Sequence, residues 1–149
     1  MSENFPLQTL LDLAKDRMDD AARRLGELIG AAKEDEGRLT VLQQYRAEYA
    51  ERFMETARNG IGPDAWRNFT AFIGRLDDAI AQQQKIVEQA RERTAASQQA
   101  WIAERNRVKA FDTLSVRHHQ EQVRKEARHE QRATDEHSAK LFRDRTDEE

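Results

Sequence analysis

The pattern that most constrains this chain is an apolar repeat whose steps alternate between three and four residues. One repeat runs from Leu7 to Phe53, and a second runs from Phe69 to Phe111 with more polar members. Side chains that recur every 3.5 residues lie on one narrow seam of an α-helix. The sequence therefore predicts an all-α fold, a long two-helix antiparallel coiled-coil hairpin. The expected seam positions are Leu7, Leu11, Ala14, Met18, Ala21, Leu25, Leu28, Ala32, Asp35, Leu39, Leu42, Arg46, Tyr49 and Phe53, then Phe69, Ile73, Leu76, Ile80, Gln83, Val87, Ala90, Thr94, Ser97, Trp101, Glu104, Val108 and Phe111.

A turn near residues 59–64 is expected to separate the two helices. This segment contains Gly60, Gly62 and Pro63, which interrupt helices. Asp64 is expected to cap the second helix, because Asp is a favoured N-cap residue.

The hairpin is predicted to occupy residues 1–116. Residues 117–149 carry 8 Lys/Arg and 9 Asp/Glu but few apolar side chains. We therefore expect them to form a charged helical overhang or a flexible tail. A weak apolar edge there could contact another protein, although a charge-rich segment of this kind is more often simply solvated.

A turn centred near residue 61 would pair residues that lie equally far from it in sequence. Arg46 would then face Asp77, which would neutralise a polar position of the seam. Val108 would face Ala14, and Phe111 would face Leu11 in the same register.

Composition excludes several classes of function. The 149 residues are 36% charged and 7% aromatic, with a net charge of −3 and no cysteine. No apolar run approaches the roughly 20 residues of a membrane span, so direct membrane insertion is not expected. Nucleic acid is not expected as a partner, because the basic residues Arg124, Lys125, Arg128 and Arg132 are offset by neighbouring glutamates. A cytoplasmic protein is the default expectation.

Catalytic, metal-binding and cofactor-binding sites are not predicted. The chain has no glycine-rich phosphate loop and no nucleophile–histidine arrangement, and a hairpin offers no water-excluding pocket. The histidines His118, His119, His129 and His137 lack the spacing of ligands on one helix face.

A second apolar row lies beside the seam near the turn. Phe72, Ala79 and Ile86 each precede a seam residue of the second helix, and Tyr45 lies beside the seam of the first. A two-helix seam covers only a narrow strip, so part of this surface could remain exposed and bind a partner. The alternative is a locally wide core in which these rings lie flat over the seam.

Three motifs resemble the flagellar export protein FliJ family. The first is Phe5 to Ala14, which follows the pattern F-x-L-x-x-L-L-x-x-A. The second is Leu39 to Tyr49, with leucines and tyrosines at matching spacing, and the third is Asn68 to Gln83. The similarity covers roughly residues 5–116 and carries no recognisable motif beyond them.

The resemblance implies a non-enzymatic, stalk-like coiled coil of the flagellar type III export apparatus. The implied partners are the export ATPase ring, the cytoplasmic domain of the export gate and export chaperones, at the cytoplasmic side of the inner membrane at the flagellar base. It also places the terminal end of the hairpin in or near the ATPase ring. A stalk protein of a virulence injectisome and a generic adaptor coiled coil are the alternatives. The positions that match the family's gate-binding patch are Leu42, Tyr45, Tyr49, Phe72, Leu76, Ala79 and Gln83.

Overall fold

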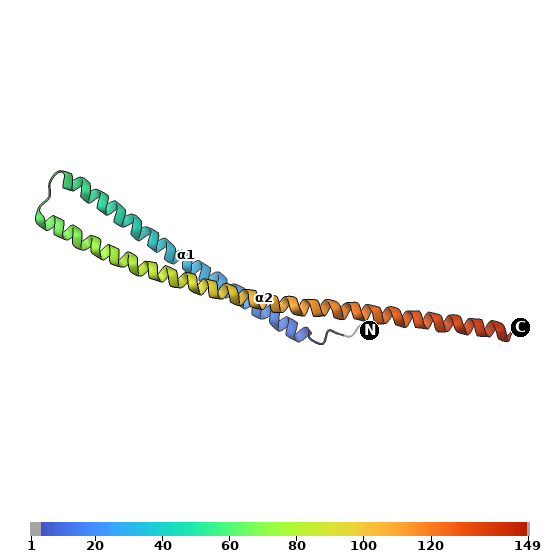
Figure 1. Ribbon diagram of the computed structural model, residues 1–149. Helices are drawn as coiled ribbons and strands as arrows, with labels where there is room; N and C mark the ends of the chain where they lie inside the picture. Colours follow the sequence, from blue (N-terminus) through green and yellow to red (C-terminus); the bar gives the residue numbers. More distant parts are fainter. Residues whose placement is uncertain (1–3, 149) are drawn as a thin grey trace. The chain divides into compact units, whose positions relative to one another are not determined.

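The computed structural model in Figure 1 describes residues 4–148 and contains two α-helices over that range. Helix α1 spans Gln8–Arg58, with 51 residues, and helix α2 spans Pro63–Asp147, with 85 residues. No strand occurs among these described residues. The predicted all-α helical hairpin is confirmed.

The turn depends on one left-handed glycine. After α1 ends at Arg58, the amide of Asn59 donates to the Thr56 carbonyl at 3.1 Å, and that of Gly60 donates to the Ala57 carbonyl at 3.0 Å. Gly60 has φ of 86°, a conformation that residues with a Cβ adopt only at a cost. The glycine therefore ends α1 and reverses the chain.

Helix α2 begins two residues earlier than an N-cap at Asp64 would place it. Pro63 is its first residue, a position where the missing N–H costs no intrahelical hydrogen bond. The amide of Trp66 donates to the Gly62 carbonyl at 3.2 Å. Asp64 lies inside the first turn and pairs with Arg67 at 2.6 Å, so the prediction that it caps the helix was wrong.

The described residues form two compact units, and the seam continues in each. One unit comprises Asp19–Ala103, and the other comprises the residues up to Met18 together with those from Glu104 onward.

In the unit of Asp19–Ala103, α1 and α2 lie side by side in opposite directions (Figure 1). Its most deeply buried side chains all occupy expected seam positions, and most of them are small. Small seam residues allow the two helix backbones to approach closely. These buried residues are Ala32, Leu76, Val87, Ala90 and Ser97.

The other unit contains a cluster of buried hydrophobic side chains. Leu11, Ala14 and Val108 form this cluster, and Met18 and Phe111 pack against it. Leu11 and Ala14 are 3% and 2% exposed. The pairings expected for Val108 and Phe111 both fall within this cluster.

The last part of α2 is a solvent-exposed helix. Every described residue from Val123 to Glu148 is exposed. The division into a hairpin of residues 1–116 and a segment of residues 117–149 stays a prediction, and residues 1–3 and 149 lie outside the described range. No helix among the described residues is long and apolar enough to cross a membrane.

Candidate partner-binding surface

A continuous group of aromatic rings lies beside the turn and joins the two helices. The rings of Phe53 and Phe69 stack with their centroids 3.7 Å apart and their planes inclined by 6°. Tyr49 stacks on Phe69 at 5.7 Å and contacts Phe72 at 4.6 Å. Offset or tilted pairs, such as those that Tyr49 makes with Phe69 and Phe72, stabilise a structure beyond the area that they bury. The aromatic group consists of Tyr45, Tyr49, Phe53, Trp66, Phe69 and Phe72.

Tyr45 and Trp66 are the two exposed members of the aromatic group, and of the two Tyr45 lies further from the turn in sequence. Its ring meets the edge of Phe72 in a T-shaped contact, with centroids 6.2 Å apart. Tyr45 is nevertheless 44% exposed, whereas Tyr49 and Phe72 are half-buried. A partner could therefore touch Tyr45 without displacing a core residue.

Apolar side chains from both helices extend this surface along one flank of the seam. Tyr45 immediately precedes the seam residue Arg46, and Phe72 immediately precedes Ile73, so the contact between Tyr45 and Phe72 shows that this flank is shared. Phe72, Ala79 and Ile86 recur every seven residues, so they stay on this flank along α2. On α1, Val41 lies one helical turn before Tyr45 and adds an exposed apolar side chain. Val41 is 63% exposed and Ile86 is 41% exposed. We call this set the flank surface, and it comprises Val41, Tyr45, Phe72, Ala79 and Ile86.

A shallow hollow of ≈ 640 Å³ adjoins the flank surface. Gly37 contributes to it because it has no side chain, and a Cβ built there would meet nothing within 4 Å. Arg38 lies at its edge and pairs with Asp35 at 3.8 Å. The lining residues are Glu34, Gly37, Arg38, Val41, Leu42 and Gln83.

The seven positions expected from the family resemblance lie close together, but they differ in accessibility. Tyr45 is exposed. Five of the positions are half-buried, namely Leu42, Tyr49, Phe72, Ala79 and Gln83.

Leu76 is only 8% exposed, so it can support the surface but offers little area to a partner. The side-chain amide of Gln83 donates to the Asp35 main-chain carbonyl at 2.9 Å, which turns this side chain toward α1. Val41 was not among the expected positions, although its place four residues before Tyr45 could have indicated it.

An ion pair crosses the hairpin beside this surface. The guanidinium of Arg46 donates to both carboxylate oxygens of Asp77, and the longer of the two contacts is 3.4 Å. This hydrogen bonding lowers the pKa of the Asp77 carboxyl, and it raises the pKa of Arg46. Both side chains stay charged at neutral pH, and the polar seam position is neutralised as expected.

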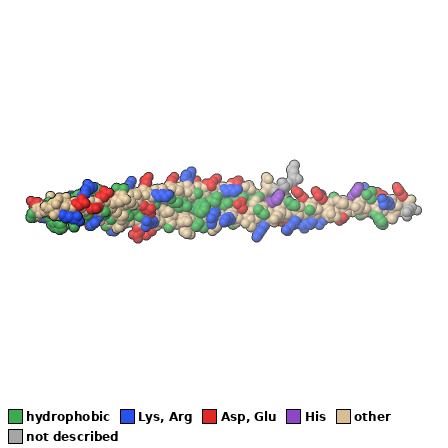
Figure 2. Space-filling view, turned by 90° about the horizontal axis from the view of Figure 1, so that it is seen from above, with side chains coloured by type: hydrophobic (Ala, Val, Ile, Leu, Met, Phe, Trp, Pro, Cys, Tyr) green, Lys and Arg blue, Asp and Glu red, His purple; other side chains and the backbone are tan. Residues whose placement is uncertain are grey.

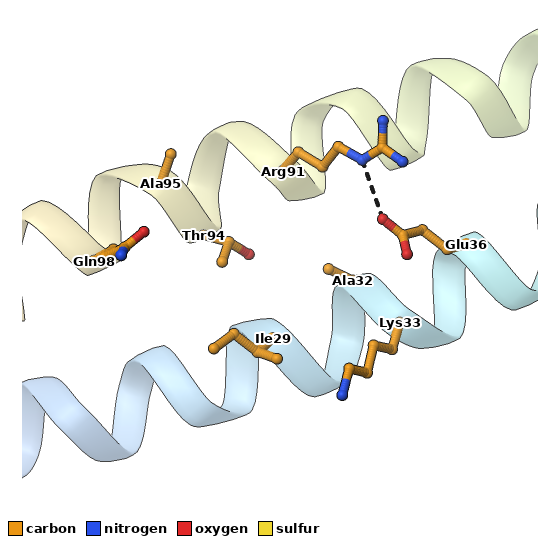
Figure 3. A pocket seen from close by; sticks show the side chains of 8 residues that line it. All are labelled: Ile29, Ala32, Lys33, Glu36, Arg91, Thr94, Ala95 and Gln98. Carbon is orange, nitrogen blue, oxygen red and sulfur yellow. Dashed lines mark hydrogen bonds and ion pairs between the residues drawn. The ribbon is translucent and has the colours of Figure 1, made fainter.

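A second hollow, of ≈ 330 Å³, lies further along the same unit. Figure 3 shows Ala32 of α1 and Thr94 of α2 facing each other across it, with the ion pair of Arg91 and Glu36 at one end. The Arg91 Nε lies 3.1 Å from the Glu36 carboxylate. Small seam residues leave this space, and its polar groups do not converge on a common point. The described residues contain no group of three or more His, Asp or Glu that could hold a metal ion.

Comparison with known proteins shows which family the chain belongs to. The flagellar FliJ protein family matches residues 2–147. The chain belongs to this family. It is 32% identical over 136 residues to the flagellar FliJ protein of Salmonella typhi, which covers 91% of this chain and 92% of that protein. The flagellar FliJ protein of Escherichia coli (strain K12) matches with the same identity and coverage.

The family resemblance seen in three short motifs is thereby confirmed over nearly the whole chain. Membership of the flagellar FliJ family makes this chain a component of the flagellar protein export apparatus.

Proposed function

We propose that this chain is a non-enzymatic, stalk-like coiled coil that links the export ATPase ring to the export gate. It binds the cytoplasmic domain of the gate through the flank surface and assists the delivery of chaperones and their substrates. Its place is the cytoplasmic side of the inner membrane at the flagellar base.

The exposed flank surface is the observation that carries this proposal. A coiled coil that only had to hold itself together would place polar residues at positions such as Val41, Tyr45 and Ile86. These three side chains are instead 63%, 44% and 41% exposed. Apolar side chains gathered on one flank are typical of a protein-binding surface.

Gate binding can be tested with variants that leave the half-buried rings of Tyr49, Phe69 and Phe72 in place. We expect Val41→Ala with Tyr45→Ala to weaken binding of the purified gate domain by about tenfold or more, since both side chains are accessible. Tyr49 is less suitable, because it contacts Phe69 and Phe72 and its loss would disturb the fold. Isothermal titration calorimetry gives the affinity, and circular dichroism reports helicity.

Met54→Ala is the matched control for this experiment. Met54 lies on the same helix and is 57% exposed, but it does not belong to the flank surface. The affinity of this variant for the gate domain should stay within about twofold of that of the unaltered chain. Equal affinity of the Val41/Tyr45 variant and the unaltered chain would rule out the flank surface as the gate contact.

The link to the ATPase requires a separate measurement. We expect the full chain to raise the hydrolysis rate of the purified export ATPase, and the chain without residues 117–149 to do so less. A generic adaptor coiled coil would leave the hydrolysis rate unchanged.

A further inference from the structure

One face of α2 between residues 117 and 132 is basic, although this stretch of sequence contains charges of both signs. At 3.6 residues per turn, its five cationic side chains fall within an arc of about 100°. Glu121 is the one acidic residue within that arc, and Glu126 and Glu130 project from the opposite side. Figure 2 shows Lys and Arg side chains along one edge of this part of the molecule and acidic ones along the other. We call this face the basic face, and its cations are Arg117, Arg124, Lys125, Arg128 and Arg132.

The cations of the basic face are largely uncompensated within the chain. Lys125 lies 3.9 Å from Glu121. Among the described residues, none of the four arginines of this face has a carboxylate within the 4.0 Å that defines an ion pair. By contrast, seven arginines elsewhere in α1 and α2 do have such a partner, namely Arg23, Arg38, Arg46, Arg52, Arg67, Arg91 and Arg107.

Exposure and charge together indicate a partner that carries carboxylates. All five cations are exposed, so they can meet another surface without a change in fold. A lipid bilayer fits poorly, because Val123 is the one large apolar side chain between residues 117 and 132, and it projects away from the basic face. A nucleic acid fits poorly too, because this stretch has no Phe, Tyr or Trp on which single-stranded bases could stack, and Glu121 would face the phosphates of a duplex from within the basic face.

We propose that the basic face docks by charge complementarity onto a carboxylate-rich protein surface, and that its partner is the export ATPase. The choice of the ATPase rests on the proposed function, whereas the chemistry of the contact rests on the basic face alone. This surface is separate from the flank surface, so the two variant sets test different contacts.

The test compares charge reversals on and off the basic face of the full chain. Arg124→Glu with Arg128→Glu should weaken binding to the purified export ATPase by about tenfold or more at low salt. Arg143→Glu with Arg145→Glu is the control, since it changes the net charge equally in the same exposed helix but outside the basic face. The control should stay within about twofold of the unaltered chain. Raising the salt from about 50 mM to about 500 mM should remove most of the difference between the two reversals.

Neutral variants and circular dichroism separate docking from helix loss. Arg124→Gln with Arg128→Gln keeps good helix formers and should weaken binding less than the reversal does. Unchanged helicity with reduced binding supports the proposal. Binding that falls only in proportion to lost helicity overturns it.

The remaining outcomes also decide the matter. If the unaltered chain binds the ATPase and both reversals bind as well as it does, the basic face is not the contact, and the proposed function stands. Equal weakening by both reversals would show a non-specific charge effect and overturn the proposal. If the unaltered chain fails to bind the ATPase, the ATPase link of the proposed function and this inference both fail. Tighter, basic-face-dependent binding to a DNA duplex or to phosphatidylglycerol vesicles would assign the face to another class of partner.

Discussion

Arg46 of α1 and Asp77 of α2 form an ion pair across the hairpin, although 31 positions separate them in the sequence. Each would otherwise place a charge beside an apolar seam. Their pairing favours one alignment of the helices, because a shift of one helical turn would leave both charges without this partner. Partly exposed ion pairs contribute little to stability, so the main effect of this one is on register.

The same pair predicts how stability depends on pH. Because the pKa of Asp77 is lower in the folded chain than in the unfolded chain, its contribution is present above the unfolded value, about 3.9. It is lost as the pH falls through the lower, folded value. Asp77→Asn should therefore melt at a lower temperature than the unaltered chain at pH 7, and this difference should shrink below about pH 4. Thermal melts followed by circular dichroism would check this. The adjacent Asp78→Asn serves as a control, and an equally large effect at pH 7 would contradict the assignment.

Two neighbouring leucines offer a direct test of the seam. Leu11 is 3% exposed and lies in the buried cluster with Ala14 and Val108, whereas Leu10 is 47% exposed. We expect Leu11→Ala to lower the free energy of unfolding by about 3 kcal/mol. Leu10→Ala should change it by less than about 1 kcal/mol, because its side chain is already half in water. Urea denaturation of the full chain measures both values, and similar losses at the two positions would disprove the seam at this end of α1.

The turn glycines should respond differently to the same substitution. Gly60→Ala should lower the free energy of unfolding by about 1–2 kcal/mol, because φ of 86° is unfavourable for a residue with a Cβ. Gly62 does not have a positive φ, and a Cβ there would meet nothing within 4 Å. Gly62→Ala should therefore be neutral or slightly stabilising. Chemical denaturation distinguishes the two, and a neutral Gly60→Ala would show that the turn takes another conformation in solution.

A helix-interior glycine should make the chain more stable when it is replaced. Gly30 lies within α1, and a Cβ built there would meet no atom within 4 Å. Gly30→Ala should therefore raise the free energy of unfolding by roughly 0.8–1 kcal/mol, through helix propensity alone. Thermal and urea melts would measure the gain. A loss of stability would mean that α1 needs this glycine for a local distortion that the structure does not contain.

Much of the packing could be predicted because a coiled coil makes burial a simple function of spacing. Every expected seam position, from Leu7 to Phe53 and from Phe69 to Phe111, is buried or half-buried in the structure. Even the polar members follow the rule, since the seam residue Gln83 bonds the main chain of Asp35 across the hairpin. Periodicity is sufficient here because each helix has one partner and one buried face.

Features that depend on geometry around the helix were harder to predict. Asp64 was expected to cap α2, but Pro63 already begins the helix and leaves the carboxylate to pair with Arg67. The high exposure of Val41 depends on how far its side chain lies from the seam. A heptad pattern predicts the exposure of side chains outside the seam only approximately.

The basic face shows the same limit for charge. Counted along the sequence, Glu121, Glu126 and Glu130 offset the nearby cations. Around the helix, Glu126 and Glu130 lie opposite the arginines, so the balance holds for the segment but not for each of its faces. Charge counts along a helix therefore need to be made one face at a time.

The exposed part of α2 after Val123 has a thermodynamic consequence. With no described side chain there buried, its helical state relies on local propensity, which is marginal for isolated segments of this length in water. Any partner that binds it as a helix must first suppress its fluctuations, and this entropy loss reduces the affinity. Alanine or glycine at Ser138, which is outside the basic face, would therefore change the dissociation constant by altering helix propensity alone.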